Sequence, residues 1–215
     1  MSFNVAISQR IDMIEGYNEV RDSLDREWYS VLQDLCPPET NVFPVPNVEE
    51  LCVEFLRVIE PRMVVLTGGN DIFATDEGSL PVGFRNAVEG QLLSYAVEHK
   101  LPVFAVCRGF QFVNAYLKGE MHRVSGHVAS CHELFSPSDR TGMPVCLVNS
   151  YHNFGVSTEE LATDLLPVLL DCDGNVEAAI HDFLPWVGIM WHPERKCRDR
   201  LASDWLRDQI SGILS

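Results

Sequence analysis

Short apolar runs alternate with amphipathic stretches along the first half of the chain. Apolar runs of this kind are typical of strands that are buried on both faces of a sheet. The runs that we interpret as strands are residues 3–7, 62–67 and 102–106. The stretches with apolar residues at helical spacing, which we interpret as helices, are residues 20–35, 48–58, 84–99 and 109–117. This alternation predicts a three-layer α/β fold with a mostly parallel central sheet and helices on both faces.

After Lys118 the pattern changes to shorter pieces with strand character. These pieces are residues 121–124, 127–135, 145–150, 176–181 and 187–191. Asp173-Gly174 is typical of a hairpin turn, and residues 201–214 close the chain as a helix. No repeat, low-complexity tract or flexible linker interrupts the sequence, so we predict one domain over residues 1–215.

Composition narrows the class of protein. The chain has 215 residues, 46% of them hydrophobic and 22% charged, as in a globular protein. No apolar run approaches the roughly 20 residues that span a bilayer, and the first residues do not form a signal peptide. We therefore expect a cytoplasmic protein without a membrane partner. The net charge of -15 disfavours nucleic acid as a partner, and an anionic substrate would need local positive charge at the site.

Cysteines and histidines are the candidates for metal or disulfide chemistry. Seven scattered cysteines without a CxxC pair predict reduced thiols, mostly small buried hydrophobic residues, with Cys107 as the exception. His122, His127 and His132 lie at five-residue intervals with Cys131 beside the last. This spacing fits neither usual structural zinc pattern, and odd separations along a strand alternate between its faces. The sequence therefore predicts no metal and no cofactor.

The segment around Cys107 has the properties of a nucleophile elbow. Cys107 follows the strand 102–106 directly and precedes a predicted helix, with the small residues Ala105 and Gly109 two positions to either side. The N–H groups and positive dipole end of that helix would face the sulfur. Both features favour the thiolate, which is the reactive form of cysteine.

Two further segments supply the groups that a cysteine nucleophile needs. His192 ends a predicted strand and Glu194 follows two residues later, which gives a general base and a carboxylate to orient it. The strand 62–67 ends in paired glycines, so the N–H of Gly69 can approach the reacting carbonyl. With the N–H of Arg108, it forms the predicted oxyanion hole.

These segments resemble the class I glutamine amidotransferases, also called the γ-glutamyl hydrolase-like superfamily. The shared pattern is G-x-C-x-G-x-Q followed late in the chain by H-P-E, and Ala105 stands here where glycine is usual. The resemblance implies a flavodoxin-like fold, a Cys107–His192–Glu194 triad and hydrolysis through a γ-glutamyl thioester. The positions that resemble those holding the glutamyl group in relatives are Gln111, Asn149, Ser150, Tyr151, His152, Asn153 and Phe154.

A narrower resemblance is to the γ-glutamyl-CDP-amidate hydrolases, which release glutamate and cytidine diphosphoramidate in bacterial capsule synthesis. The segments that carry it are residues 7–10, 68–71, 107–109, 149–154, 188–192 and 194–195. It implies a small-molecule, nucleotide-linked γ-glutamyl substrate. Arginine is suited to phosphate, so we hypothesise that some of Arg10, Arg21 and Arg108 bind the diphosphate, with Arg21 near the start of a helix.

Other interpretations of the same residues stay open. The chain could be a glutaminase subunit that delivers ammonia to a separate synthetase, which would require a docking surface. Its Cys-Arg-Gly-x-Gln segment also resembles γ-glutamyl-aminobutyrate hydrolases. A binding module with an idle site is a third interpretation, which the intact Cys107, His192 and Glu194 disfavour.

Overall fold

A seven-stranded sheet forms the centre of the protein. The computed structural model describes residues 2–14, 16, 19–72, 82–138, 144–195 and 199–215. In spatial order the strands are β11 (Leu165–Leu170), β12 (Val176–His181), β13 (Trp186–Ile189), β6 (Val103–Val106), β5 (Met63–Leu66), β1 (Phe3–Ile7) and β4 (Thr40–Pro44). Neighbours from β4 to β13 run parallel, whereas β12 and β11 pair antiparallel.

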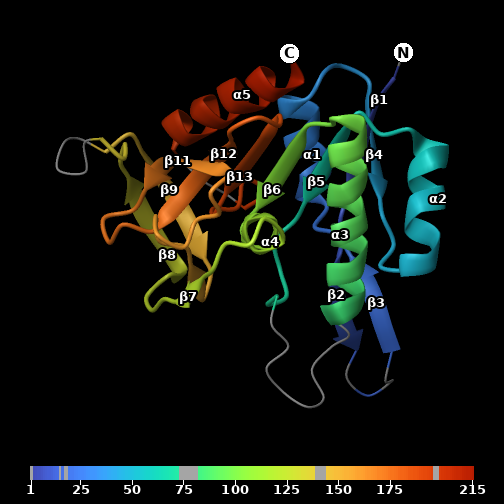
Figure 1. Ribbon diagram of the computed structural model, residues 1–215, viewed down its shortest axis with the longest axis horizontal. Helices are drawn as coiled ribbons and strands as arrows, with labels where there is room; N and C mark the ends of the chain where they lie inside the picture. Colours follow the sequence, from blue (N-terminus) through green and yellow to red (C-terminus); the bar gives the residue numbers. More distant parts are fainter. Residues whose placement is uncertain (1, 15, 17–18, 73–81, 139–143, 196–198) are drawn as a thin grey trace.

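Helices cover both faces of this sheet (Figure 1). One hydrophobic core joins the sheet to α2 (Glu49–Ile59), α3 (Val82–His99) and α4 (Arg108–Tyr116). A second core on the opposite face joins it to α1 (Glu27–Leu35) and α5 (Arg200–Leu214). The predicted three-layer α/β fold is confirmed. None of the helices in the described part of the chain is long and apolar enough to cross a membrane.

Three small two-stranded sheets extend from this framework (Figure 1). They are β2 (Arg10–Ile14) with β3 (Glu19–Ser23), β8 (Val128–Leu134) with β9 (Cys146–Tyr151), and β7 (His122–Arg123) with β10 (Phe154–Gly155). The first pair corrects the prediction of one helix over residues 20–35. Residues 19–23 pair with β2, and α1 begins only after Asp25, whose carboxylate accepts the N–H of Glu27 at 3.0 Å.

Strands β2, β4, β10 and β11 have no counterpart among the predicted elements. β11 contains Pro167, which argues against a strand in the middle of a sheet. It is tolerated because β11 is an edge strand whose register with β12 shifts next to Pro167. The predicted hairpin turn at Asp173-Gly174 does join β11 to β12.

The expected burial of the six cysteines other than Cys107 is confirmed only in part. Cys36, Cys52 and Cys146 are buried. Cys131 and Cys172 are exposed, because Cys131 faces outward from β8 and Cys172 lies in the turn before β12. Cys197 lies outside the described residues.

The order of the strands in the central sheet brings the predicted catalytic residues together. β5, β6 and β13 are neighbours and run in the same direction, so their carboxyl ends lie side by side. The segment after β5 holds Gly68 and Gly69, the residue after β6 is Cys107, and His192 follows β13. Carboxyl ends of parallel strands are where α/β proteins place their sites.

Candidate active site

Cys107 lies in a sharp turn between β6 and α4. Its backbone has φ 51° and ψ −108°, a strained conformation for a residue with a side chain. Hydrogen bonds hold the turn: Cys107 N–H donates to the carbonyl of Ile189 at 2.7 Å, and Gln111 N–H donates to the carbonyl of Cys107 at 3.0 Å. A Cβ on Gly109 would lie 2.3 Å from the carbonyl oxygen of Leu66, so only glycine fits there.

The thiol of Cys107 is almost fully buried, with 5% of the residue exposed. Burial raises the pKa of this thiol to about 12, although the N–H of Arg108 at the start of α4 acts in the opposite direction. The charges of Glu194 and Glu177 raise the pKa further. The predicted effect of the helix terminus is present, since the N–H of Arg108 favours the thiolate, but desolvation outweighs it and the net shift favours the protonated thiol. The sulfur needs a base to remove its proton.

His192 has the geometry of such a base. Its Nδ1 lies 2.6 Å from Oε1 of Glu194, and both side chains are buried. A proton on Nδ1 donated to Glu194 leaves the lone pair on Nε2. Nε2 is buried and has no hydrogen-bond partner among the described residues. Gly68 packs against the ring, since a Cβ there would lie 2.4 Å from Cε1 of His192.

Asn149 holds the backbone of His192 instead of facing the cavity. Its Nδ2 donates to the carbonyl of His192 at 2.9 Å, and its Oδ1 accepts the N–H of His192 at 2.9 Å. Ser150 is also turned inward, because its hydroxyl donates to the carbonyl of His127 at 2.7 Å. Both residues were predicted to contact the glutamyl group, and their polar atoms are bonded within the protein.

A cavity of about 240 Å³ opens beside Cys107 and His192. Its lining includes both predicted oxyanion-hole residues, Gly69 and Arg108. The other predicted binding residues that line it are Gln111, Tyr151, His152 and Asn153. A smaller cavity of about 70 Å³ adjoins it and is lined on its far side by Arg10 and Trp28, with Gly69, His192 and Arg195 common to the two.

A buried ion network connects the two halves of the predicted oxyanion hole. Arg85 donates to the carbonyls of Thr67, Gly68 and Gly69 at 2.7, 3.1 and 3.3 Å, and to Glu89 at 2.9 Å. Glu89 also pairs with the side chain of Arg108. Burial lowers the pKa of Arg85 to about 9. The sequence reasoning missed Arg85 and Glu89, whose only signal is their spacing of four on a helix.

The three arginines proposed for the diphosphate have different surroundings. The guanidinium of Arg108 is buried and already paired with Glu89, so its charge is neutralised within the protein. Arg21 corrects the predicted helix start: it lies on β3, is exposed, and pairs with Glu19 at 2.9 Å. Arg10 lines the smaller cavity and pairs with Asp12 at 2.7 Å.

Arg195 is the cation that the sequence reasoning missed. It lines both cavities and has no ion-pair partner among the residues that the structure describes. Its guanidinium carbon lies 4.1 Å above the ring of Tyr151, which in turn meets the ring of His192 edge-on at 5.8 Å. Its position directly after Glu194 was the available signal.

Gln111 lines the larger cavity, whereas Phe154, the remaining predicted binding residue, does not and supports the wall from behind through its backbone carbonyl. The side-chain amide of Gln111 donates to the carbonyl of Phe154 at 3.0 Å, and Nδ1 of His152 lies 2.9 Å from the same oxygen. This shared acceptor ties α4 to the segment after β9. His152 also belongs to a cluster of described side chains with the donor set of a metal site.

Comparisons with known proteins show which family and fold the chain resembles. The sequence pattern of the peptidase C26 family matches residues 42–194, which include Cys107, His192 and Glu194. A Campylobacter jejuni protein named γ-glutamyl-CDP-amidate hydrolase is 30% identical over 193 residues, 89% of this chain and 90% of that protein. A putative GMP synthase component from Thermoplasma acidophilum has the same fold, with a TM-score of 0.66 and 17% identity over 100% of this chain and 94% of its own. A glutamine amidotransferase from Thermotoga maritima gives 0.60 and 16% over 99% and 84%.

Proposed function

This chain belongs to the peptidase C26 family of class I glutamine amidotransferase-like hydrolases, which act on amide C–N bonds, and we propose that it cleaves a γ-glutamyl amide with Cys107 as the nucleophile. One observation carries the proposal. The elbow cysteine and a histidine with a buried, unbonded Nε2 line the same cavity. That combination is the requirement for attack by sulfur on a carbonyl bound between them.

The mechanism follows from the protonation states. Because burial keeps the Cys107 thiol protonated, His192 Nε2 removes the proton as the sulfur attacks the γ-carbonyl. Glu194 stabilises the imidazolium that forms through the 2.6 Å contact with Nδ1. The N–H groups of Gly69 and Arg108 stabilise the oxyanion.

Collapse of this intermediate breaks the C–N bond, and the imidazolium gives its proton to the departing nitrogen. The product on the protein is a γ-glutamyl thioester on Cys107. His192 then removes a proton from water, which attacks the thioester and releases glutamate and the free thiol.

We propose γ-glutamyl-CDP-amidate as the substrate, with cytidine diphosphoramidate as the second product. The similarity to the Campylobacter jejuni protein of that name, over nine-tenths of both chains, supports this choice. Arg195 and Arg10 add support, since they place positive charge at the two cavities of a protein with net charge -15. Arginine binds phosphate oxygens in a bidentate manner.

Glutamate release from separate substrates tests this function. Purified protein is incubated with γ-glutamyl-CDP-amidate and, separately, with L-glutamine and a γ-glutamyl-aminobutyrate conjugate. We expect fast release from the nucleotide conjugate alone. Release from glutamine, or from none until a synthetase is added, would favour a glutaminase subunit. Release from the aminobutyrate conjugate alone would favour a γ-glutamyl-aminobutyrate hydrolase and would remove the proposed role of Arg10 and Arg195.

A further inference from the structure

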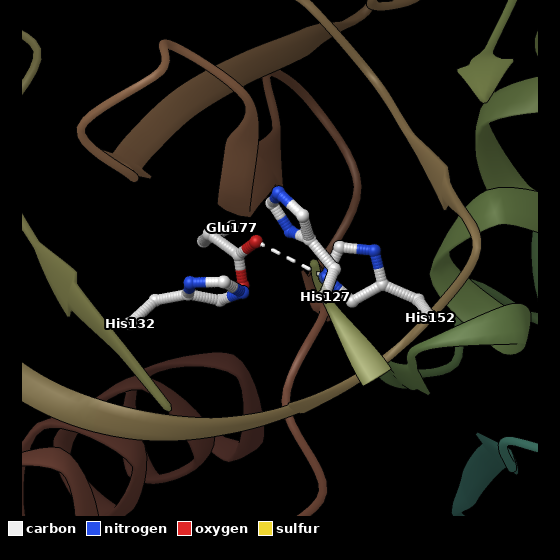
Figure 2. A group of neighbouring side chains, drawn as sticks. All are labelled: His127, His132, His152 and Glu177. Carbon is white, nitrogen blue, oxygen red and sulfur yellow. Dashed lines mark ion pairs between the residues drawn. The ribbon is translucent and has the colours of Figure 1, made fainter. Parts of the chain in front are cut away.

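Three histidines and a glutamate converge between the small β8–β9 sheet and the central sheet (Figure 2). His127 precedes β8, His132 lies on β8, His152 follows β9 and Glu177 lies on β12. One nitrogen from each histidine and a carboxylate oxygen all lie within 4.8 Å of one another. The side chains therefore meet at one point although they come from three separate parts of the chain.

The atoms that face this point are buried and unbonded. His127, His152 and Glu177 are 5%, 3% and 0% exposed. Nδ1 of His127, Nε2 of His132, Nε2 of His152 and both oxygens of Glu177 have no hydrogen-bond partner among the described residues. Buried polar groups are costly without partners, so such a concentration of lone pairs indicates a ligand that binds them together.

The contact between His152 and Glu177 is particularly informative. Nδ1 of His152 lies 2.9 Å from the carbonyl of Phe154, which can only accept, so Nδ1 carries the proton. In the neutral ring, Nε2 is then a lone pair, and it lies 3.3 Å from Oε1 of Glu177. Two acceptors at this distance repel each other unless a cation lies between them. A proton on His152 would satisfy this pair and leave the lone pairs of His127 and His132 unbonded.

We propose that His127, His132, His152 and Glu177 bind a zinc ion. Three imidazole nitrogens and one carboxylate oxygen are ligands of tetrahedral zinc, with bonds of about 2.0–2.2 Å. Ligand atoms at the corners of such a tetrahedron lie about 3.3 Å apart. The distance between His152 Nε2 and Glu177 Oε1 already has this value, and all four ligand atoms lie within 4.8 Å of one another.

The chemistry around the four ligands also favours zinc over other cations. Magnesium and calcium prefer all-oxygen sites, and redox-active iron sites leave coordination positions open for oxygen. The bond from Nδ1 of His152 to Phe154 is the outer interaction that fixes a metal-binding histidine. Asp171, which has a carboxylate oxygen within 4.8 Å of a ring nitrogen of His127, adds a negative charge next to this ligand, while its own oxygens accept from Asn175.

The proposal departs from the expectation of no metal, which rested on spacing within residues 122–132. His122 instead pairs with Glu160 at 2.6 Å, and Cys131 faces outward from β8. Alternation along β8 turns His132 inward. The two ligands that complete the site come from later in the chain: His152 follows β9 and Glu177 lies on β12, too far from residues 122–132 for a spacing rule to link them.

A zinc ion here would be structural. Four protein ligands close the coordination sphere and leave no position for substrate. The ion would fix His152, and with it the segment Tyr151–Asn153 that lines the larger cavity. Through the carbonyl of Phe154, the same segment is joined to Gln111 on the helix that follows Cys107. The inference does not depend on the proposed substrate, because metal content is measured without turnover.

Metal analysis of the purified protein tests the site. The full chain is produced in zinc-supplemented medium, dialysed against metal-free buffer and analysed by inductively coupled plasma mass spectrometry. We expect about one zinc per chain, as for a closed four-ligand site. After removal of metal with dipicolinate, titration with ZnCl₂ against a chromophoric chelator should restore about one equivalent. Cobalt in its place should give the visible absorption of a tetrahedral Co²⁺ site.

Variants identify the ligands. Glu177→Gln has nearly the same shape as the native side chain, and His132→Ala removes the most exposed ligand; each should lower zinc affinity at least about 10-fold. His122→Ala and His181→Ala serve as matched controls and should keep one equivalent. Far-UV circular dichroism checks that each variant is folded. Wild-type protein that binds no zinc, or Glu177→Gln that binds it as tightly as wild type, would overturn the proposal.

Discussion

Asn149 and His192 exchange two hydrogen bonds of 2.9 Å, in which the side-chain amide of Asn149 pairs with both backbone groups of His192. Asn149 lies on β9, outside the central sheet, whereas His192 follows β13 inside it. The contact therefore anchors the proposed base to a neighbouring layer. The imidazole ring of His192 is held separately by Glu194. The backbone and the ring of this histidine are therefore positioned by different residues.

Asn149→Ala should lower kcat for glutamate release by about 10²-fold, because a small displacement of the base lengthens the proton transfer. KM should change little, since Asn149 does not line the cavity. Steady-state kinetics separate the two parameters. Asn41→Ala, which removes an exposed amide that bonds to Asn4, is the control. A rise in KM at constant kcat would instead indicate that Asn149 binds substrate.

Cys107→Ala should reduce glutamate release by at least about 10³-fold, because no other group can form the thioester. His192→Ala should cause a loss of similar size, since the buried thiol would keep its proton. Intact-mass spectrometry of quenched reactions should detect a glutamyl adduct in the wild type and none in Cys107→Ala. Exposed Cys131→Ala should retain full turnover.

Glu89→Gln should destabilise the protein by about 3 kcal/mol, because it leaves Arg85 and Arg108 buried without their common anion. Urea denaturation measures the free energy of unfolding. The matched variant Glu54→Gln breaks an exposed pair with Arg57 and should change it by less than about 0.5 kcal/mol. Equal effects of the two substitutions would contradict the assigned role of the buried network.

Arg195→Ala should raise KM for γ-glutamyl-CDP-amidate about 10-fold through loss of a charge-assisted contact. KM for a γ-glutamyl substrate without phosphate should stay within about twofold. Arg21→Ala, whose guanidinium pairs with Glu19 on an exposed hairpin, should leave both values unchanged. Equal losses on the two substrates would assign Arg195 to the glutamyl group instead.

The raised pKa of Cys107 predicts how its reactivity depends on pH. At a pH between 9 and 12, a thiol with a pKa of about 12 is still mostly protonated, whereas one with a pKa of 9.0 is mostly deprotonated. Cys107 of the substrate-free protein should therefore be alkylated slowly at pH 7–9 and faster above that range. Iodoacetamide labelling followed by peptide mass spectrometry measures the rate at Cys107, with exposed Cys131 as the reference in the same sample. An inflection near pH 7 would indicate a preformed thiolate.

The folded protein should also lose stability as pH rises above 9, because the native thiol binds a proton that the unfolded chain releases. Burial gives Cys36 and Cys52 raised pKa values of about 11, so they act in the same direction. Comparison of urea denaturation at pH 7 and pH 10 for wild type and Cys107→Ala isolates the share of Cys107. The loss of unfolding free energy between pH 7 and pH 10 should be smaller in Cys107→Ala than in the wild type. A larger loss in the variant would contradict the prediction.

The sequence by itself determined the features that depend on neighbouring residues. The apolar runs at 62–67 and 102–106 predict strands because a strand that is buried on both faces is apolar at nearly every position. The local arrangements around the proposed triad are visible in the sequence. Cys107 stands between Ala105 and Gly109, and Glu194 follows two residues after His192. The hairpin β2–β3 could not be read, because β3 is almost entirely exposed and polar.

Only the tertiary structure decided which side chains remain available for chemistry. Burial set the pKa of Cys107, and packing turned Arg108 toward Glu89 and Asn149 toward His192. The four proposed zinc ligands come from segments up to 50 residues apart, which meet because β8, β9 and β12 converge. Desolvation and long-range contact depend on the whole fold, so no local pattern of residues encodes them.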